Sequence, residues 1–365
     1  MKTTLLAANL PGALARAEAE ACRLLEAGEA VALPTETVYG LAADALRPEA
    51  AAKIFEAKER PSFDPLICHL PNRVWLQQMT DIAKEDMRLV RELTSRFWPG
   101  PLTLVLPRRE IVPDIVTSGL DTVAVRMSAH PIFSAILRRF DKPLAAPSAN
   151  RFGRISPTTA THVHSELDGR IPLIVDGGPT QHGIESTIVA VEDGSLRLLR
   201  AGPITPDELA EAWIAVCHAE RHIPTKVDVQ AFYVRMGISP DGTPLEEEDA
   251  PIEAPGQMQS HYAPRTPLRL LPRGAHVHFY GEQVRRVGSL SFQERRSAQE
   301  FAAQEVLSTT GDLREAAATL FAKMRRLDEA DLDLIIAEPV PETGLGIAIM
   351  DRLRKAAAAF SAPAE

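Results

Sequence analysis

The sequence predicts an α/β protein with two domains of unequal size, and three observations support this. The chain has 365 residues, which favours a first domain of roughly 200 residues followed by a smaller one. Short apolar segments alternate with amphipathic ones over most of the chain, as strands and helices do. A stretch rich in Pro, Gly and acidic residues interrupts this pattern at residues 216–264, which is typical of a linker.

The first elements surround a polar loop. Residues 13–27 carry apolar side chains at helical spacing, and Gly28 stands where a helix would end. Residues 30–33 are apolar and stop at Pro34, so we expect a buried strand that leads into the loop PTET. A second helix is expected at residues 48–58.

Seven later segments are short and apolar, and we expect them to be strands. They are LICHL, PLTLVLP, DTVAVRM, PLAAPS, PLIVDGG, ESTIVAV and LRLLR, with helices near residues 83–96 and 131–139. The later strands follow one another too closely for helical crossovers, so we predict a twisted mixed, partly antiparallel sheet with flanking helices. This sheet is assigned to residues 1–215.

The tail, residues 265–365, predicts a small C-terminal Rossmann-like α/β domain. Its expected strands are LRLL, VHFYG and LDLIIAEP, and its expected helices lie around residues 313–327 and 347–360. No motif in it indicates a ligand.

Composition excludes several classes of protein. The net charge of −9 argues against non-specific binding of nucleic acid, which depends on surplus Lys and Arg. Cys22, Cys68 and Cys217 form no CxxC pair, so we expect buried thiols rather than a zinc site or disulfides. The first residues do not resemble a signal peptide, and there is no apolar run of membrane-spanning length, so we expect a cytoplasmic protein without membrane contact.

Two polar segments could bind a small ligand, although each also has an ordinary structural explanation. The hydroxyls of Thr35, Thr37 and Tyr39 follow a buried strand, where α/β folds place ligand contacts, but a Thr-rich turn would look the same. Lys58 and Arg60 lie at a helix exit before a proline and would suit a polyphosphate. A solvated basic helix end is the alternative.

The segment DTVAVRM places an arginine inside an apolar strand. Its period of two puts Thr122, Ala124 and Arg126 on one face. A buried arginine needs a charge partner, and we favour a ligand carboxylate over an internal one because no acid on this strand apart from Asp121 is an evident partner. His69 in LICHL becomes a site candidate if it meets Arg126, and is otherwise a core histidine bonded to a backbone carbonyl.

Two later loops offer further polar groups. Ser148 and Asn150 follow an apolar strand, and Ser186 and Thr187 open another strand after a glycine-rich loop that includes Gly183. Both loops could also be simple turns. Because GxxxxGK[ST] and a strand-to-helix GxGxxG are absent, a nucleotide site here must be of another kind. The motifs HExxH and GxSxG are absent as well.

Taken together, these segments resemble the threonylcarbamoyl-AMP synthase family in its long form, which joins a YrdC-like catalytic domain to a second domain. The resemblance runs in order through PTETVYGLAADA, IFEAKERP, WPGPLTLVL, GLDTVAVRMSAHP, APSAN, SPT, VDGG, GIESTIV, APGQMQSHYAP and GIAIMDRLRKAA. That set covers nearly the whole chain.

The resemblance implies roles for individual residues. The KxR and SxN signatures of the family correspond to Lys58, Arg60, Ser148 and Asn150, with catalytic roles for the first two. L-threonine contacts are implied for Thr37, His69, Arg126, Ala146 and Ser186. ATP contacts are implied for Lys58, Arg60, Asp64, Thr122, Ser148, Asn150, Ser156, Arg200 and Tyr262, the last from the linker.

Two positions depart from the family pattern. Asp64 stands in RPSFDP where an asparagine is usual, and a carboxylate near phosphates should weaken that contact. Asp351 in the tail also replaces a usual asparagine.

The resemblance implies a nucleotidyltransferase that converts L-threonine, bicarbonate or CO2, and ATP into threonylcarbamoyl-AMP and pyrophosphate. It further implies Mg²⁺ bound with ATP, handover of the product to a threonylcarbamoyl transferase, and use in the modification of tRNA next to the anticodon, with any tRNA contact indirect. The alternative is an RNA-binding module of the same fold without synthase activity, which the acidic net charge opposes.

Overall fold

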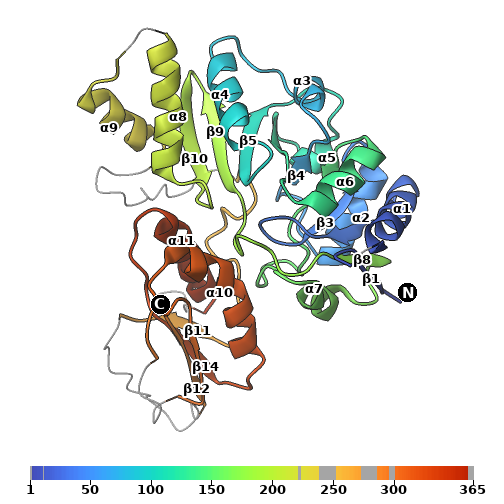
Figure 1. The fold of residues 1–365 in the computed structure, drawn as a ribbon, viewed down its shortest axis with the longest axis vertical. Helices are drawn as coiled ribbons and strands as arrows, with labels where there is room; N and C mark the ends of the chain where they lie inside the picture. Colours follow the sequence, from blue (N-terminus) through green and yellow to red (C-terminus); the bar gives the residue numbers. More distant parts are fainter. Residues whose placement is uncertain are drawn as a thin grey trace.

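The computed structural model describes residues 2–10, 12–220, 223–237, 252–272, 286–295 and 301–360, which form two α/β units (Figure 1). The larger unit is built on a ten-stranded sheet in the order β1-β8-β2-β3-β7-β4-β6-β5-β9-β10. Its strands are β1 (Thr4–Ala7), β2 (Val31–Leu33), β3 (Gly40–Asp44), β4 (Ile67–His69), β5 (Leu102–Pro107), β6 (Thr122–Arg126), β7 (Leu144–Ala145), β8 (Leu173–Asp176), β9 (Thr187–Glu192) and β10 (Ser195–Arg200).

Parallel and antiparallel neighbours alternate irregularly along this sheet. Strand β4 pairs with β6 in parallel and with β7 antiparallel, while β5 pairs antiparallel with β6 and parallel with β9. The predicted mixed, partly antiparallel sheet is therefore confirmed.

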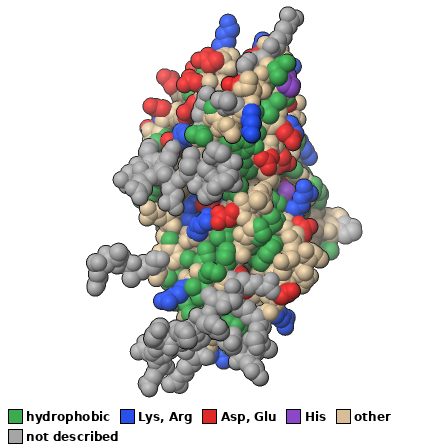
Figure 2. Space-filling view, turned by 90° about the vertical axis from the view of Figure 1, so that its left-hand side faces the viewer, with side chains coloured by type: hydrophobic (Ala, Val, Ile, Leu, Met, Phe, Trp, Pro, Cys, Tyr) green, Lys and Arg blue, Asp and Glu red, His purple; other side chains and the backbone are tan. Residues whose placement is uncertain are grey.

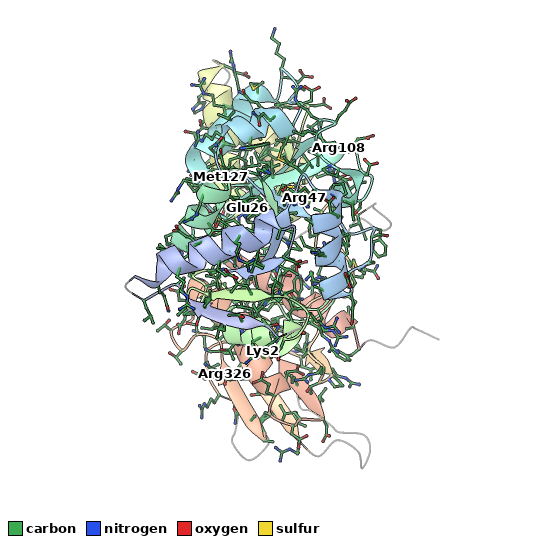
Figure 3. The ribbon with its side chains drawn as sticks, turned by 90° about the vertical axis from the view of Figure 1, so that its right-hand side faces the viewer. Lys2, Glu26, Arg47, Arg108, Met127 and Arg326 are labelled. Atoms are coloured by element: carbon green, nitrogen blue, oxygen red, sulfur yellow. The ribbon has the colours of Figure 1, made fainter. Side chains whose placement is uncertain are left out.

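Helices cover both faces of this sheet. They are α1 (Ala13–Glu26), α2 (Pro48–Lys58), α3 (Val74–Met79), α4 (Met87–Phe97), α5 (Asp114–Thr117), α6 (Pro131–Phe140), α7 (Ala160–Leu167), α8 (Pro206–Ala219) and α9 (Lys226–Arg235). In β2, Val31 and Leu33 pack toward α1 and α6, while Ala32 belongs to the main core on the other side. Burial on both faces explains why the strands read as continuous apolar runs. Arg47 Nη1 donates to the Glu26 carbonyl at 3.0 Å and ties α1 to the start of α2 (Figure 3).

The smaller unit is a parallel sheet in the order β11-β14-β12-β13, packed with two helices. Its elements are β11 (Leu268–Leu270), β12 (Val287–Ser291), β13 (Ala303–Val306), α10 (Leu313–Asp328), β14 (Leu334–Ala337) and α11 (Leu345–Ala358). The expected strands LRLL and LDLIIAEP and both expected helices are present, which confirms a second α/β domain. The strand expected at VHFYG lies outside the described residues.

The segment expected as a linker contains helical structure. The division expected after residue 215 falls inside α8, and α9 packs against α8 and β10. Thr225 caps α9 by accepting from the Asp228 backbone N–H, an arrangement that stabilises a helix start. Residues 252–264 then pass along the larger unit before β11 begins.

The two units share one apolar cluster. Val38, Ile155 and Ile184 of the larger unit pack with the core of the smaller one. A Cβ added at Gly183 would lie 2.4 Å from the Ala318 carbonyl oxygen of α10, so the loop before β9 touches this helix backbone directly.

The cysteines and the apolar character of the helices also bear on the sequence expectations. Cys22, Cys68 and Cys217 are buried free thiols. Among the described helices, none is both long and apolar enough to cross a membrane.

Candidate functional site

A small polar cavity lies at the centre of the larger sheet, where the 252–264 segment crosses it. Its volume is about 40 Å³, which is room for a few water molecules. The lining residues are Thr35, Thr37, Val38, Gly40, Arg60, Ile67, His69, Arg126, Ala146, Pro147, Ser148, Glu185, Ser186, Arg200, Pro255, Gly256, His261 and Tyr262. A nucleotide can therefore enter only if part of this wall moves.

Neighbouring strands bring the central polar groups together. His69 at the end of β4 is in register with Arg126 at the end of β6, and Arg126 is in register with Thr103 of β5. The Thr103 hydroxyl lies 2.8 Å from the Ser186 hydroxyl just before β9. The condition set for His69 as a site candidate, that it meets Arg126, is thus fulfilled.

Arg126 has an internal acid partner, which corrects the expectation that it has none. Its Nη2 pairs with Glu36 Oε1 at 2.5 Å, and its Nη1 donates to Thr37 Oγ1 at 3.1 Å. Ser128 also donates to Glu36. Burial alone would raise the pKa of Glu36, but the Arg126 charge and the Ser128 hydroxyl outweigh it and lower the pKa to about 2. The Nε of Arg126 has no hydrogen-bond partner among the described residues.

The PTET loop is held by its own hydroxyls. Thr35 Oγ1 accepts from the backbone N–H groups of Thr37 and Val38. Tyr39 points away from the cavity and donates to the Gly178 carbonyl at 2.7 Å. Thr37 therefore presents its side chain beside Arg126, whereas Thr35 and Tyr39 shape the loop.

His69 is a neutral group in this setting. Burial and, next, the Arg126 charge lower the pKa of His69 to about 3. Its ring packs on Phe133 with centroids 4.7 Å apart, and its Nδ1 has no partner among the described residues. The imidazole can accept or donate a hydrogen bond to a ligand without bringing a second positive charge.

The two basic residues after α2 have different surroundings. Helix α2 ends at Lys58, and the next residue, Glu59, turns the chain with a φ of 56°. Lys58 and Arg60 on either side of it are both buried. Lys58 Nζ donates to the carbonyls of Ser148 and Asn150. It supports the SxN loop and is not among the residues that line the cavity.

Arg60 lines the cavity and is held from behind. Its Nη2 lies 2.9 Å from Asp64 Oδ1 and 2.7 Å from the Pro65 carbonyl oxygen. Burial raises the pKa of Asp64 despite the nearby Arg60 charge. Asp64 itself does not line the cavity.

The loop after β7 is built mainly from backbone contacts. Ser148 lines the cavity, while Asn150 Nδ2 donates to the carbonyls of Arg151 and Arg154 and so closes the loop. Ser156 donates its hydroxyl to Glu185. Asn150 and Ser156 therefore stand behind the wall.

Arg200 at the end of β10 connects the site to the 252–264 segment. Its Nη2 donates to Ser186 Oγ and its Nη1 to the Pro255 carbonyl, both at 3.1 Å. Tyr262 lies opposite, 1% exposed, with a hydroxyl that has no partner among the described residues. A Cβ at Gly256 would meet that hydroxyl at 2.7 Å, so a glycine is needed for this approach.

The cavity thus brings together nine of the fourteen residues to which the family resemblance assigns a role. These are Thr37, Arg60, His69, Arg126, Ala146, Ser148, Ser186, Arg200 and Tyr262. The other five, Lys58, Asp64, Thr122, Asn150 and Ser156, are outside its lining in this conformation.

Sequence reasoning missed several groups at the site. Glu36 was seen only as part of a polar loop, and Glu185 and His261 were not considered. Each is adjacent to a residue that was considered, namely Thr37, Ser186 and Tyr262, and this adjacency was the available signal. Burial and then the charges of Arg60 and Lys58 lower the pKa of His261, so it too is neutral.

The described residues contain no group of three or more His, Cys, Asp or Glu side chains placed to hold a metal ion. Glu185 is the single carboxylate in the described cavity lining, and it already contacts Ser156 and Arg352. Three arginines and several hydroxyls instead suit a ligand with carboxylate and phosphate groups.

The mixed sheet with its arginine-lined cavity and appended parallel domain defines an α/β protein whose cavity suits a small anionic ligand. Comparison with known proteins makes this specific. Residues 23–202 match a family model described as "Telomere recombination", and residues 205–358 match one described as "Threonylcarbamoyl-AMP synthase, C-terminal domain". The chain belongs to the threonylcarbamoyl-AMP synthase family, which confirms the resemblance.

Relatives are similar over almost their whole length. The chain is 42% identical to threonylcarbamoyl-AMP synthase of Bacillus subtilis, over 93% of this chain and 92% of the relative. It is 39% identical to that of Pyrococcus abyssi, over 92% of both. A crystal structure of P. abyssi Sua5 complexed with L-threonine is 34% identical, with a TM-score of 0.79 over 97% of this chain and 98% of that one.

Proposed function

We propose that this chain is an L-threonylcarbamoyladenylate synthase, which combines L-threonine, bicarbonate and ATP into threonylcarbamoyl-AMP and releases pyrophosphate. Family membership and the relatives' names support the activity. The observation that carries the substrate assignment is Arg126 beside His69 and Thr37 in one cavity, because a relative of this fold is complexed with L-threonine.

In the first half of the reaction, residues at and beside the strand ends bind L-threonine. Glu36 fixes the orientation of the Arg126 guanidinium. Arg126 Nε, which has no partner among the described residues, donates a hydrogen bond to the amino-acid carboxylate. In this proposal, neutral His69 and the Thr37 hydroxyl bind the threonine hydroxyl. The threonine amine, once deprotonated, attacks the carbon of CO2 or bicarbonate and forms a carbamate. Attack on CO2 releases a proton, whereas attack on bicarbonate releases water.

In the second half of the reaction, cationic side chains near the loop after β7 act on the nucleotide. A carbamate oxygen attacks the α-phosphorus of ATP, the bond between this phosphorus and the bridging oxygen breaks, and pyrophosphate leaves. Arg60 and Arg200 line the cavity and supply positive charge for the developing negative charge. We expect Mg²⁺ to arrive on the ATP phosphates and to be held mainly by them and by water.

The product is a mixed anhydride that must pass to a threonylcarbamoyl transferase acting on tRNA. A direct RNA-binding role has less support, because charged side chains of both signs are spread over the face shown in Figure 2 and the net charge is −9.

The decisive experiment measures pyrophosphate released from ATP with radiolabelled bicarbonate, with and without L-threonine. We expect release and label incorporation to require threonine. ATP turnover that ignores threonine would refute the synthase, and salt-dependent RNA affinity without turnover would favour the RNA-binding alternative.

A single variant tests the carboxylate clamp. Arg126→Ala should raise KM for threonine at least about tenfold, since a charged hydrogen-bonded contact is worth roughly 1.5–3 kcal/mol. Arg108→Ala is the control. Arg108, labelled in Figure 3, pairs with the exposed Asp114 at 2.7 Å, and it does not line the cavity. An unchanged KM for threonine in the Arg126 variant would remove the clamp from the mechanism.

A further inference from the structure

One arginine of the C-terminal domain reaches three parts of the cavity wall. Arg352 on α11 is fully buried. Its Nε donates to Glu185 Oε2 at 3.2 Å, and its Nη1 donates to the Ala201 carbonyl at 2.7 Å. Its guanidinium carbon lies 5.3 Å from the ring centre of Tyr262. Glu185 and Tyr262 line the cavity, and Ala201 follows the lining residue Arg200.

The described C-terminal domain contributes no side chain to the cavity itself, because the described lining ends at Tyr262. Any influence of that domain on the chemistry must therefore pass through contacts with the wall. Glu185 is the wall residue that can transmit this influence, since one of its carboxylate oxygens accepts from Ser156 and the other pairs with Arg352. Its backbone continues directly into Ser186.

A second contact from the same helix reaches the opposite wall. Asp351 pairs with Arg352 at 2.7 Å and with Lys355 at 2.6 Å. Lys355 Nζ then donates to the carbonyl of the lining residue Gly256 at 2.6 Å. Helix α11, which Figure 1 shows close to β10, thus holds the Glu185 side and the Gly256 side of the cavity at once.

Burying this many charges is costly unless the geometry is good, and replacing them with apolar side chains is often neutral or stabilising. Stability alone therefore does not explain them. We propose that Arg352 is a positioning residue for the synthase reaction, which sets Glu185, and through it Ser156 and Ser186, in the geometry that the substrates need. The inference rests on the proposed function for its kinetic readout.

The test compares Arg352→Met, Glu185→Gln and the double variant by steady-state kinetics. We expect each single variant to lower kcat/KM for threonine-dependent pyrophosphate release about tenfold or more, within the usual range for coupling between sites. The double variant should be no worse than the worse single one, since both remove the same contact.

Arg325→Met is a matched control. Arg325 is also a buried arginine that crosses between the two units, with Nη1 donating to Glu166 at 3.1 Å and Nη2 to the Ile155 carbonyl. Neither partner lines the cavity. Its variant should lose stability in urea unfolding but keep kcat/KM within about twofold of the unmodified protein.

Equal kinetic losses in the Arg352 and Arg325 variants, or losses that multiply in the double variant, would overturn the proposal. If Arg352→Met does not fold, Arg352→Lys and Glu185→Gln carry the same comparison. Calorimetric titration with L-threonine separates the two hypotheses. If the unmodified protein releases no pyrophosphate, the proposed function is refuted. The positioning role is then judged from threonine binding alone. Weaker binding by the Arg352 variant than by the Arg325 variant supports it, and equal binding contradicts it.

Discussion

At the scale of single residues, the buried ion pair of Glu36 and Arg126 contributes both to the site and to the stability of the protein in acid. The pKa of Glu36 is about 2 in the folded protein, against 4.5 ordinarily. Its ionisation therefore adds stability above about pH 4.5, which is lost as the pH falls toward 2. A shift of this size corresponds to about 3 kcal/mol.

Glu36→Gln should accordingly destabilise the protein by about 3 kcal/mol at pH 7, because it leaves the buried Arg126 charge uncompensated. The stability lost between pH 4.5 and 3 should shrink correspondingly. Urea unfolding at pH 7, 4.5 and 3 measures both effects. Glu49→Gln breaks an exposed pair with Arg47 and should change little. Wild-type stability of the Glu36 variant at pH 7 would contradict the assigned role.

Asp64 is one of the two positions at which we expect a departure from the family pattern, and it lies directly behind a residue of the cavity wall. Its carboxylate lies 2.9 Å from Arg60, which lines the cavity. Asp64→Asn keeps the shape but removes a negative charge that competes with ATP phosphates for Arg60. We expect KM for ATP to fall severalfold and KM for threonine to stay unchanged. A higher KM for ATP would show that Asp64 helps to orient Arg60 for the nucleotide.

At the scale of elements, α2 positions the loop after β7 through its last residue. Lys58→Met should remove two charge-assisted hydrogen bonds to the Ser148 and Asn150 carbonyls, and each unsatisfied buried carbonyl costs roughly 1–3 kcal/mol. We expect both urea stability and threonine-dependent pyrophosphate release to fall, the latter at least about tenfold. Lys53→Met on the same helix breaks only a half-exposed pair with Glu29. If the two variants behave alike, Lys58 does not position the loop.

The elements also show what could be predicted from sequence. Local periodicity placed Arg126 on the correct face of β6, since Ala124 joins a separate small cluster while Val123 and Val125 enter the main core. It could not pair Arg126 with Glu36, because 90 residues separate them and only the strand order joins them. Strands β12 and β13 were missed because VGSLS and AQEV contain serine, glycine and charge. Helix α9 was hidden by its Pro-rich surroundings.

At the scale of the whole molecule, we expect activity to depend on how the two units meet. Contact between them combines a shared apolar cluster with the close approach of Gly183 to α10. Gly183 has a φ of +70°, and it precedes the Glu185 and Ser186 segment by two residues. Packing at this point therefore places the C-terminal domain against the wall of the cavity.

Gly183→Ala tests that dependence because a Cβ would lie 2.4 Å from the Ala318 carbonyl oxygen. The substitution also carries the cost of a left-handed backbone, roughly 1–2 kcal/mol. Gly194→Ala isolates this second cost, since Gly194 has a φ of +68° with nothing within 4 Å of an added Cβ. We expect the Gly183 variant to lose more stability in urea and to lose turnover, while the Gly194 variant loses only stability. Because the backbone strain is matched in the two variants, a loss of turnover confined to Gly183→Ala would come from the displaced contact with the C-terminal domain. Equal turnover in both variants would show that the cavity does not depend on this contact.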